Sequence, residues 1–219
     1  MNKFDFTKEN SFINKELTEK LLVRFDKIFN QKIYSTDLSN IKELTKYTIL
    51  KEPLFISVFK QIHKKFQKIV NATDLRFEKL WLVNSESKDT NETILPYVPH
   101  IDKKRFLKAM VYLNDVSINN GPIHLGKAKD NINIEEKRKK LPSDYKAKKL
   151  NIISNKNLES NLIPMVGKAG DVIFFDTNTP HKAGIISKGY YRKILRFDFE
   201  RSEFNPKKNI LKNFINKIV

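Results

Sequence analysis

The stretch FLKAMVYL at residues 106–113 alternates between two sets of side chains. Apolar residues occupy every second position, namely Leu107, Ala109, Val111 and Leu113. Because successive side chains of a strand point to opposite faces of a sheet, the pattern predicts a barrel strand with these residues on its outer face. Lys108 and Tyr112 would then point inward.

Three other segments have the composition of strands. They are rich in aromatic and β-branched residues, and turn signals separate them. The segments are Leu80–Val83, Asp171–Phe175 and Arg192–Phe199, and residues 119–122, NNGP, form a strong turn signal between the first two of these.

The N-terminal third has a helical period instead. Apolar residues within 16–29 and 54–70 recur at the spacing of one buried helix face. Pro53 stands where a helix tolerates proline, in the first turn. Helices followed by a series of strands predict an α+β fold, in which a sheet sandwich or barrel is braced by N-terminal helices.

Length and composition favour one domain over residues 1–219, with 40% hydrophobic residues. We expect a helical part over 1–75 and a strand-rich core over 76–200. No stretch reaches the roughly 20 apolar residues of a membrane span, and the N-terminus lacks a signal-peptide core, so a cytoplasmic location is expected. The chain has no cysteine, so any metal must be bound by nitrogen and oxygen atoms.

The formal charge of +17 has two interpretations. It could mark a nucleic-acid partner, or it could be solvated surface charge. The excess is mostly lysine, whereas arginine is favoured for recognising phosphates and bases, so surface charge is the preferred interpretation.

Two segments stand outside the strand pattern. Residues 126–164 read as an insertion with a basic cluster at Lys137, Arg138, Lys139 and Lys140, and loops of this length are often lids over a site. A lid with these lysines would favour a small substrate that carries a phosphate or a carboxylate, whereas the alternative is a surface loop without such a role. Residues 205–219 place apolar residues on one face and predict a packed C-terminal helix.

His100 and Asp102 are two residues apart, and on a strand they would share a face and could reach one ion. His181 follows an apolar strand and a turn, and it completes a set of two histidines and one carboxylate. Such a set binds non-haem Fe(II) and leaves positions open on the metal. Arg192, 11 positions beyond His181 (192 − 181), can bind a carboxylate through two nitrogens.

These motifs resemble the phytanoyl-CoA dioxygenase family. The resemblance rests on PHID at 99–102, FLKAMVYLNDV at 106–116 and NGP at 120–122. It continues through GKAGD at 167–171, FFD at 174–176, His181, Gly189 and Arg192, so that it covers roughly residues 75–200. One departure follows the NGP turn, where the family usually shows Pro-Gly-Ser-His and this chain has IHLG at 123–126. His124 could therefore contact the substrate or serve the fold, and we favour the fold.

The resemblance implies a double-stranded β-helix, a jelly roll of the cupin type, with iron at its open end. It implies that Fe(II) is held by His100, Asp102 and His181, and that 2-oxoglutarate binds the iron and pairs its distal carboxylate with Arg192. Arg196 would face the same way on a strand, and only the family spacing selects Arg192. The inward positions of Lys108 and Tyr112 make both candidates for binding 2-oxoglutarate, although Lys108 could instead reach solvent at the rim.

The implied activity is that of a dioxygenase that uses O2, releases succinate and CO2, and hydroxylates an unactivated C–H bond of a small molecule. The presence of Asp102 favours hydroxylation, because halogenating relatives lack that carboxylate. One alternative is a non-oxidative cupin-type metal enzyme such as an isomerase, which would have no need of Arg192. Another is a basic module that binds nucleic acid or polysaccharide on an inactive barrel. Against this module, the triad is complete and no aromatic-rich basic motif is present.

Overall fold

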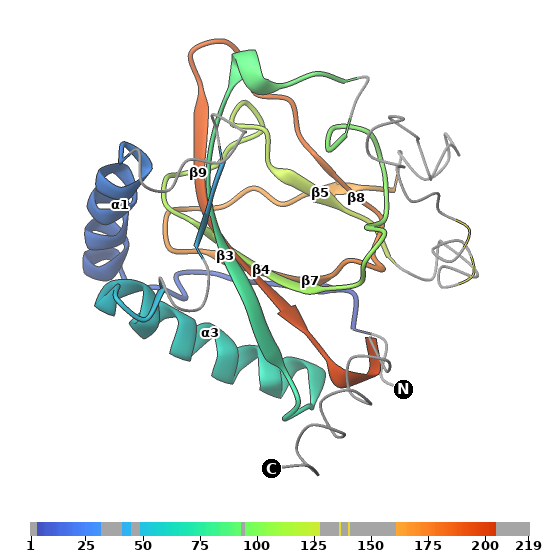
Figure 1. Cartoon of the computed structure of the whole chain (residues 1–219). Coiled ribbons are helices and arrows are strands. Elements are labelled where there is room, and N and C mark those ends of the chain that lie inside the picture. Colours follow the sequence, from blue (N-terminus) through green and yellow to red (C-terminus); the bar gives the residue numbers. More distant parts are fainter. Residues whose placement is uncertain are drawn as a thin grey trace.

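The computed structural model of the chain describes residues 4–31, 41–44, 49–92, 95–127, 136, 140 and 161–204. Within these residues, two helices lie on one side of a large sheet, and a smaller sheet lies on its other side (Figure 1). The helices are α1 (Lys15–Phe29) and α3 (Pro53–Val70), and short 3-10 helices span Ser87–Asp89 and Ser202–Phe204. The strands are β1 (Phe6–Glu9), β2 (Ile41–Leu44), β3 (Arg76–Glu86), β4 (Leu107–Tyr112), β5 (Ile123–Leu125), β6 (Ile163–Pro164), β7 (Val172–Asp176), β8 (His181–Ala183) and β9 (Tyr191–Glu200).

Both sheets are antiparallel. The large sheet has the order β1-β7-β4-β9-β3-β2, and the small sheet has the order β6-β5-β8. Strands that are neighbours in space are far apart in the chain, as in a jelly roll. The predicted α+β class and the double-stranded β-helix braced by helices are confirmed.

Local signals explain where the two helices begin and end. The side chain of Asn14 accepts a hydrogen bond from the backbone N–H of Leu17 at 2.9 Å and caps α1. Pro53 occupies the first turn of α3, as predicted, and Asn71 ends that helix in the left-handed conformation with a φ of 48°.

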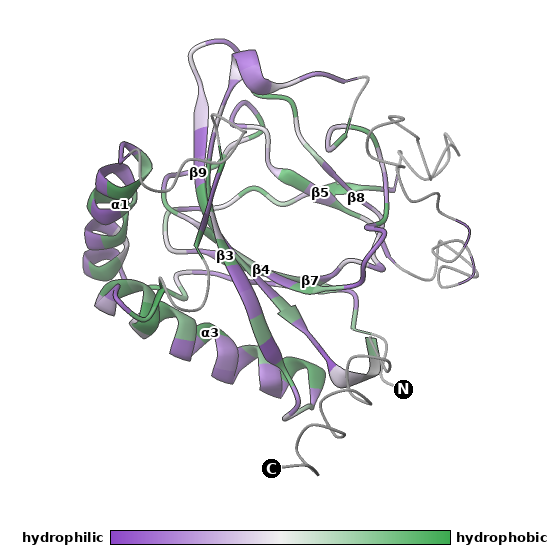
Figure 2. Cartoon of the chain, in the orientation of Figure 1, coloured by the Kyte–Doolittle hydropathy of each residue, from purple (hydrophilic) through white to green (hydrophobic). Residues whose placement is uncertain are grey.

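The helices cover the outer face of the large sheet. Their apolar faces turn toward the strands, as the colouring of Figure 2 shows. Phe66 of α3 is fully buried and packs edge-to-face against Phe4, Phe174 and Phe199, with ring centroids 5.0–5.9 Å apart. The helices therefore stabilise the outer face of the large sheet, and its inner face remains available for functional side chains.

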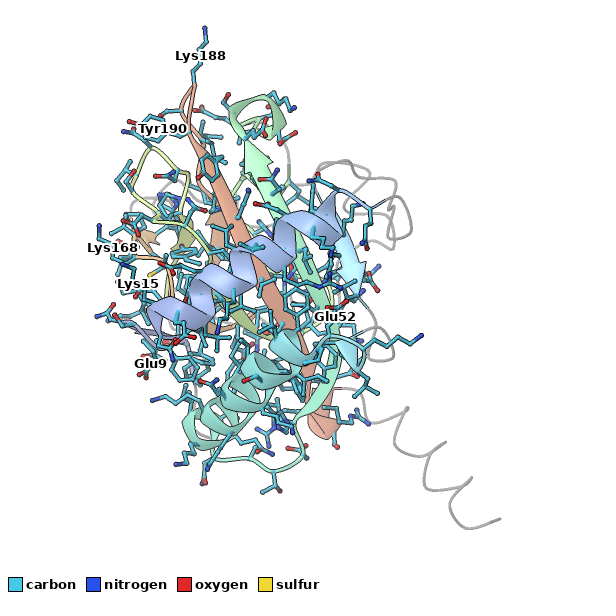
Figure 3. All side chains as sticks on the ribbon, turned by 90° about the vertical axis from the view of Figure 1, so that its left-hand side faces the viewer. Glu9, Lys15, Glu52, Lys168, Lys188 and Tyr190 are labelled. Carbon is cyan, nitrogen blue, oxygen red and sulfur yellow. The ribbon has the colours of Figure 1, made fainter. Side chains whose placement is uncertain are left out.

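An ion pair joins the two helices. Arg24 of α1 donates to both carboxylate oxygens of Glu52, at 2.5 and 2.7 Å. Glu52, which is labelled in Figure 3, stands directly before α3. The Glu52 side chain is only 7% exposed, so this bidentate contact also satisfies a buried carboxylate.

The inner face of the large sheet faces the small sheet. The alternation predicted for 106–113 is confirmed: Leu107, Ala109, Val111 and Leu113 lie in the core beneath the helices. Met110 and Tyr112 belong to a second core, between the sheets, with Phe175 of β7 and Ile123 and Leu125 of β5. By the same alternation Lys108 of β4 and Arg192 of β9 face inward.

Some structural predictions from the sequence are corrected by the structure, and others concern residues that the structure does not describe. His100 and Asp102 would share a face on a strand, but His100 makes only a single β-bridge, to His181. The predicted helix 205–219 lies outside the described residues, as does most of the insertion 126–164, and the proposed domain limits stay a prediction. Within the described part, no helix has both the length and the apolar character needed to cross a membrane.

Candidate metal centre

Two segments bring His100, Asp102 and His181 together between the sheets. His100 and Asp102 lie in the irregular segment before β4, and His181 begins β8. The backbones of His100 and His181 exchange two N–H to O=C hydrogen bonds, both at 2.9 Å. This pairing places the imidazole rings side by side, with centroids 4.3 Å apart.

The orientation of both rings is fixed by the backbone. Nδ1 of His100 lies 2.8 Å from the carbonyl oxygen of Val98, and Nδ1 of His181 lies 2.8 Å from that of Thr179. A carbonyl can only accept, so each Nδ1 carries a proton, and in the neutral form of the ring Nε2 then keeps its lone pair. Metal-binding histidines commonly make such a hydrogen bond from the ring nitrogen that does not bind the metal.

The Nε2 atoms of both rings lie near one carboxylate oxygen. Oδ1 of Asp102 lies 3.8 Å from Nε2 of His100 and 3.6 Å from Nε2 of His181. Two atoms that each bind one ion at about 2.0–2.2 Å can be no more than about 4.4 Å apart, and both separations satisfy that limit. Among the described residues, these three form the group of histidine and acidic side chains whose ligand atoms all fall within 4.8 Å of one another.

Burial and neighbouring charges hold His100 and Asp102 in the protonation states that bind a cation. Burial, reinforced by the neighbouring His181, lowers the pKa of His100 to about 3, so its ring is neutral at pH 7. Burial would raise the pKa of Asp102, but Lys108 and the two histidines outweigh it and hold that pKa well below its usual value. A neutral imidazole and an ionised carboxylate are the forms that bind metal.

Lys108 faces inward as predicted, and its ammonium group contacts Oδ2 of Asp102. Its side chain is 9% exposed, so it does not reach solvent at the rim. Its partner in the structure is thus an acidic side chain of the triad.

Arg192 is a buried cation. Its Nη1 donates to the carbonyl oxygen of Gly121, while its buried Nε has no hydrogen-bond partner. No carboxylate in the described part of the chain forms an ion pair with it. Burial lowers the pKa of Arg192, and Tyr112 and Tyr97 are near enough to oppose that shift.

The hydroxyl groups of the two tyrosines near Arg192 both donate hydrogen bonds to backbone carbonyl oxygens. The hydroxyl of Tyr112 donates to the carbonyl oxygen of Met165 at 2.7 Å, and burial raises its pKa, so it stays protonated. The hydroxyl of Tyr97 donates to the carbonyl oxygen of Asp89 at 2.8 Å. Sequence reasoning missed Tyr97, because no spacing rule connects it to Arg192.

Arg196 has quite different surroundings from Arg192. Its Nε and Nη2 donate to the carboxylate of Asp198 at 2.9 and 3.1 Å, and its guanidinium lies over the ring of Trp81. Trp81 also donates to Asp198, at 2.7 Å. His124, in contrast, sits on β5 between Ile123 and Leu125, which face the inner core, so its side chain lies on the opposite face of that strand.

The comparisons with known proteins agree with this geometry. Residues 89–194 match the model of the phytanoyl-CoA dioxygenase (PhyH) family, and this segment contains the triad and Arg192. This segment is therefore similar to the PhyH family. No curated protein matches its sequence.

Several solved structures are similar to this chain in fold. EvdO2 from Micromonospora carbonacea var. aurantiaca is 14% identical with a TM-score of 0.66, over 90% of this chain and 86% of that one. The non-haem α-ketoglutarate-dependent epimerase SnoN from nogalamycin biosynthesis is 16% identical with a TM-score of 0.62, over 91% and 78%. A Pseudomonas putida prolyl-4-hydroxylase is 13% identical with a TM-score of 0.55, over 91% and 94%.

Proposed function

We propose that this chain is a non-haem oxygenase that depends on Fe(II) and 2-oxoglutarate and oxidises an unactivated C–H bond of a small molecule. The observation that carries the proposal is the convergence of two histidine Nε2 atoms on one oxygen of Asp102, with both Nδ1 atoms held by carbonyl oxygens. Similar folds have been solved with such groups: SnoN with Fe3+ and α-ketoglutarate, and EvdO2 with 2-oxoglutarate.

The residues present fit Fe(II). His100, Asp102 and His181 would hold it, and three protein ligands leave positions open for a co-substrate and O2. When bound, iron and 2-oxoglutarate together supply the oxidising chemistry, with 2-oxoglutarate leaving as succinate and CO2. The buried surroundings of the histidines limit the access of water to the site.

Arg192 would bind the distal carboxylate of 2-oxoglutarate. A buried cation without an anion is costly, because burial removes its hydration and nothing replaces it. Arg192 is such a cation among the described residues, whereas Arg196 already has Asp198. A carboxylate placed against the unpartnered Nε of Arg192 would remove this cost.

Tyr112 would lie beside the 2-oxoglutarate bound at Arg192. Its single proton is donated to Met165, and a carboxylate can only accept hydrogen bonds. Direct binding of 2-oxoglutarate by Tyr112 would therefore require that proton to leave Met165.

We propose hydroxylation as the outcome. The support is Asp102, which supplies the acidic ligand that halogenating relatives lack, together with the likeness to a prolyl-4-hydroxylase. Structural neighbours also include an epimerase and a carbocyclase, so the product must be identified directly. Turnover under isotopically labelled O2 should put one labelled oxygen atom into a hydroxylated product, whereas an epimerised or cyclised product without it would contradict hydroxylation.

The cofactor pair can be tested without knowing the substrate. Adding Fe(II) and then 2-oxoglutarate to the metal-free protein without oxygen should produce a visible metal-to-ligand charge-transfer band. The His181→Ala variant is the control and should not give the band. A parent protein that binds Fe(II) but never shows the band would contradict the proposed function.

A further inference from the structure

We propose that Lys108 is a positioning residue, which holds Asp102 so that a single carboxylate oxygen faces the metal, and that it is not a ligand of 2-oxoglutarate. This inference rests on the proposed function, because it takes His100, Asp102 and His181 as the metal ligands. The inward position of Lys108 suggested a role in binding 2-oxoglutarate, and the proposal replaces that role. The proposal rests on the contacts of both carboxylate oxygens of Asp102.

The two oxygens of Asp102 have different surroundings. Oδ1 faces the two histidine Nε2 atoms, at 3.8 and 3.6 Å. Oδ2 contacts the ammonium group of Lys108. A carboxylate can bind a metal through one oxygen or through both, and here Lys108 occupies the second oxygen.

The location of Lys108 leaves it few other partners. It lies on β4 between Phe175 of β7 and Asp198 of β9, the residues opposite it in the two neighbouring strands. Asp198 is already engaged by Trp81 and by two nitrogens of Arg196. The ammonium group of Lys108 is nearly buried and needs an anion, and Asp102 provides it.

This arrangement keeps metal positions open. If Asp102 were free to turn, its second oxygen could take a position that 2-oxoglutarate or O2 requires. By holding Oδ2, Lys108 restricts Asp102 to one bond. Arg192, the buried cation without an acidic partner in the described structure, remains the group suited to the distal carboxylate of 2-oxoglutarate.

The first test separates contact with 2-oxoglutarate from any effect on the metal. It compares the affinities of 2-oxoglutarate and 2-oxovalerate, which lacks the distal carboxylate, for the Co(II)-loaded parent and for Lys108→Met and Arg192→Met. The preference for 2-oxoglutarate should fall about 10–100-fold in Arg192→Met, the value of a charge-assisted hydrogen bond, and should stay at the parent value in Lys108→Met. A collapsed preference in Lys108→Met would overturn the proposal.

The second test observes the metal directly. Without 2-oxoglutarate, the visible absorption of Co(II) in Lys108→Met should shift and weaken, because Asp102 can then bind through both oxygens and raise the coordination number. Lys108→Arg should restore the parent spectrum. The control is Lys79→Met, since Lys79 pairs with Glu43 and lies over Trp81, and it should match the parent. A Lys108→Met spectrum identical to the parent would also overturn the proposal.

Folding is checked by circular dichroism before each titration. If Lys108→Met does not fold, Lys108→Arg carries the test: it should keep both the spectrum and the preference, and a changed preference with an unchanged spectrum would overturn the proposal. Failure of the proposed function gives a different result. A parent that binds Co(II) but shows no affinity for 2-oxoglutarate would refute the oxygenase assignment, while the Co(II) spectra would still decide the role of Lys108.

Discussion

At the scale of single residues, Arg192 and Arg196 lie four positions apart on the inner face of β9, yet their charges are balanced differently. Arg196 is held by Asp198 and lies over Trp81, whereas Arg192 is buried with an unpartnered Nε. Sequence spacing alone could not separate them, because residues four apart on a strand face the same way. Their difference arises from Asp198, Trp81 and Gly121, which only the fold brings near.

Replacing Arg192 by alanine should weaken 2-oxoglutarate binding by about 1.5–3 kcal/mol, because a charge-assisted hydrogen bond is lost. The matched control is Arg196→Ala, whose guanidinium is already used by Asp198 and which should keep the parent affinity. Titration of the charge-transfer band measures both. Loss of affinity in the Arg196 variant alone would reverse the assignment.

The metal-free protein should lose stability as the pH falls below 6.5, the ordinary pKa of histidine. In that range the unfolded chain binds a proton at His100, whereas the folded protein does not until about pH 3. Protons therefore favour the unfolded chain, by up to about 1.4 kcal/mol per pH unit. Asp102, whose pKa is lowered in the folded protein, adds a loss in the same direction below its usual pKa.

Urea unfolding at a series of pH values measures this slope. His100→Gln should flatten it between pH 6 and pH 4.5, since glutamine does not titrate. An equally steep slope in that variant would show that other groups cause the acid sensitivity.

At the scale of elements, the long segments were predictable from sequence and the short ones were not. The predicted helices within 16–29 and 54–70 correspond to α1 and α3, and the four predicted strands lie within or overlap β3, β4, β7 and β9. Strands of two to four residues, such as β6 and β8, are too short for a period to be counted. The grouping of His100, Asp102 and His181 was predicted from sequence. The strand on which His100 and Asp102 would share a face is not formed, because His100 is positioned by one β-bridge to a residue 81 positions later (181 − 100).

The layer between α3 and the large sheet should tolerate little loss of volume. Phe66→Ala should destabilise the protein by about 3–5 kcal/mol, because it leaves a cavity among Phe4, Phe174 and Phe199. Urea denaturation measures the loss. Val23→Ala, at a position 72% exposed, is the control and should change stability by less than about 0.5 kcal/mol. An equally small effect of Phe66→Ala would contradict the packing described.

At the scale of the whole molecule, part of the formal charge of +17 lies in the basic insertion, residues 126–164, where we predict that it attracts an anionic substrate. Its ends, Gly126 and Pro164, adjoin β5 and β6 of the small sheet, which also contains His181. Most of the insertion lies outside the described residues, so its role as a lid that attracts an anionic substrate is a prediction from sequence. Such attraction would be screened by salt over a Debye length of about 8 Å.

Neutralising Lys137, Arg138, Lys139 and Lys140 together should raise the KM for an anionic substrate and flatten its salt dependence, with 2-oxoglutarate affinity unchanged. Steady-state kinetics at several ionic strengths would measure both effects. Kinetics identical to those of the parent would assign these residues to ordinary surface charge.

The most direct test of the metal centre is anomalous diffraction at the iron edge, from crystals grown without oxygen in the presence of Fe(II) and 2-oxoglutarate. We predict one peak about 2.0–2.2 Å from Nε2 of His100, Nε2 of His181 and Oδ1 of Asp102, with the distal carboxylate of 2-oxoglutarate against Arg192. A peak elsewhere in the molecule, or no peak between these three side chains, would contradict the assignment.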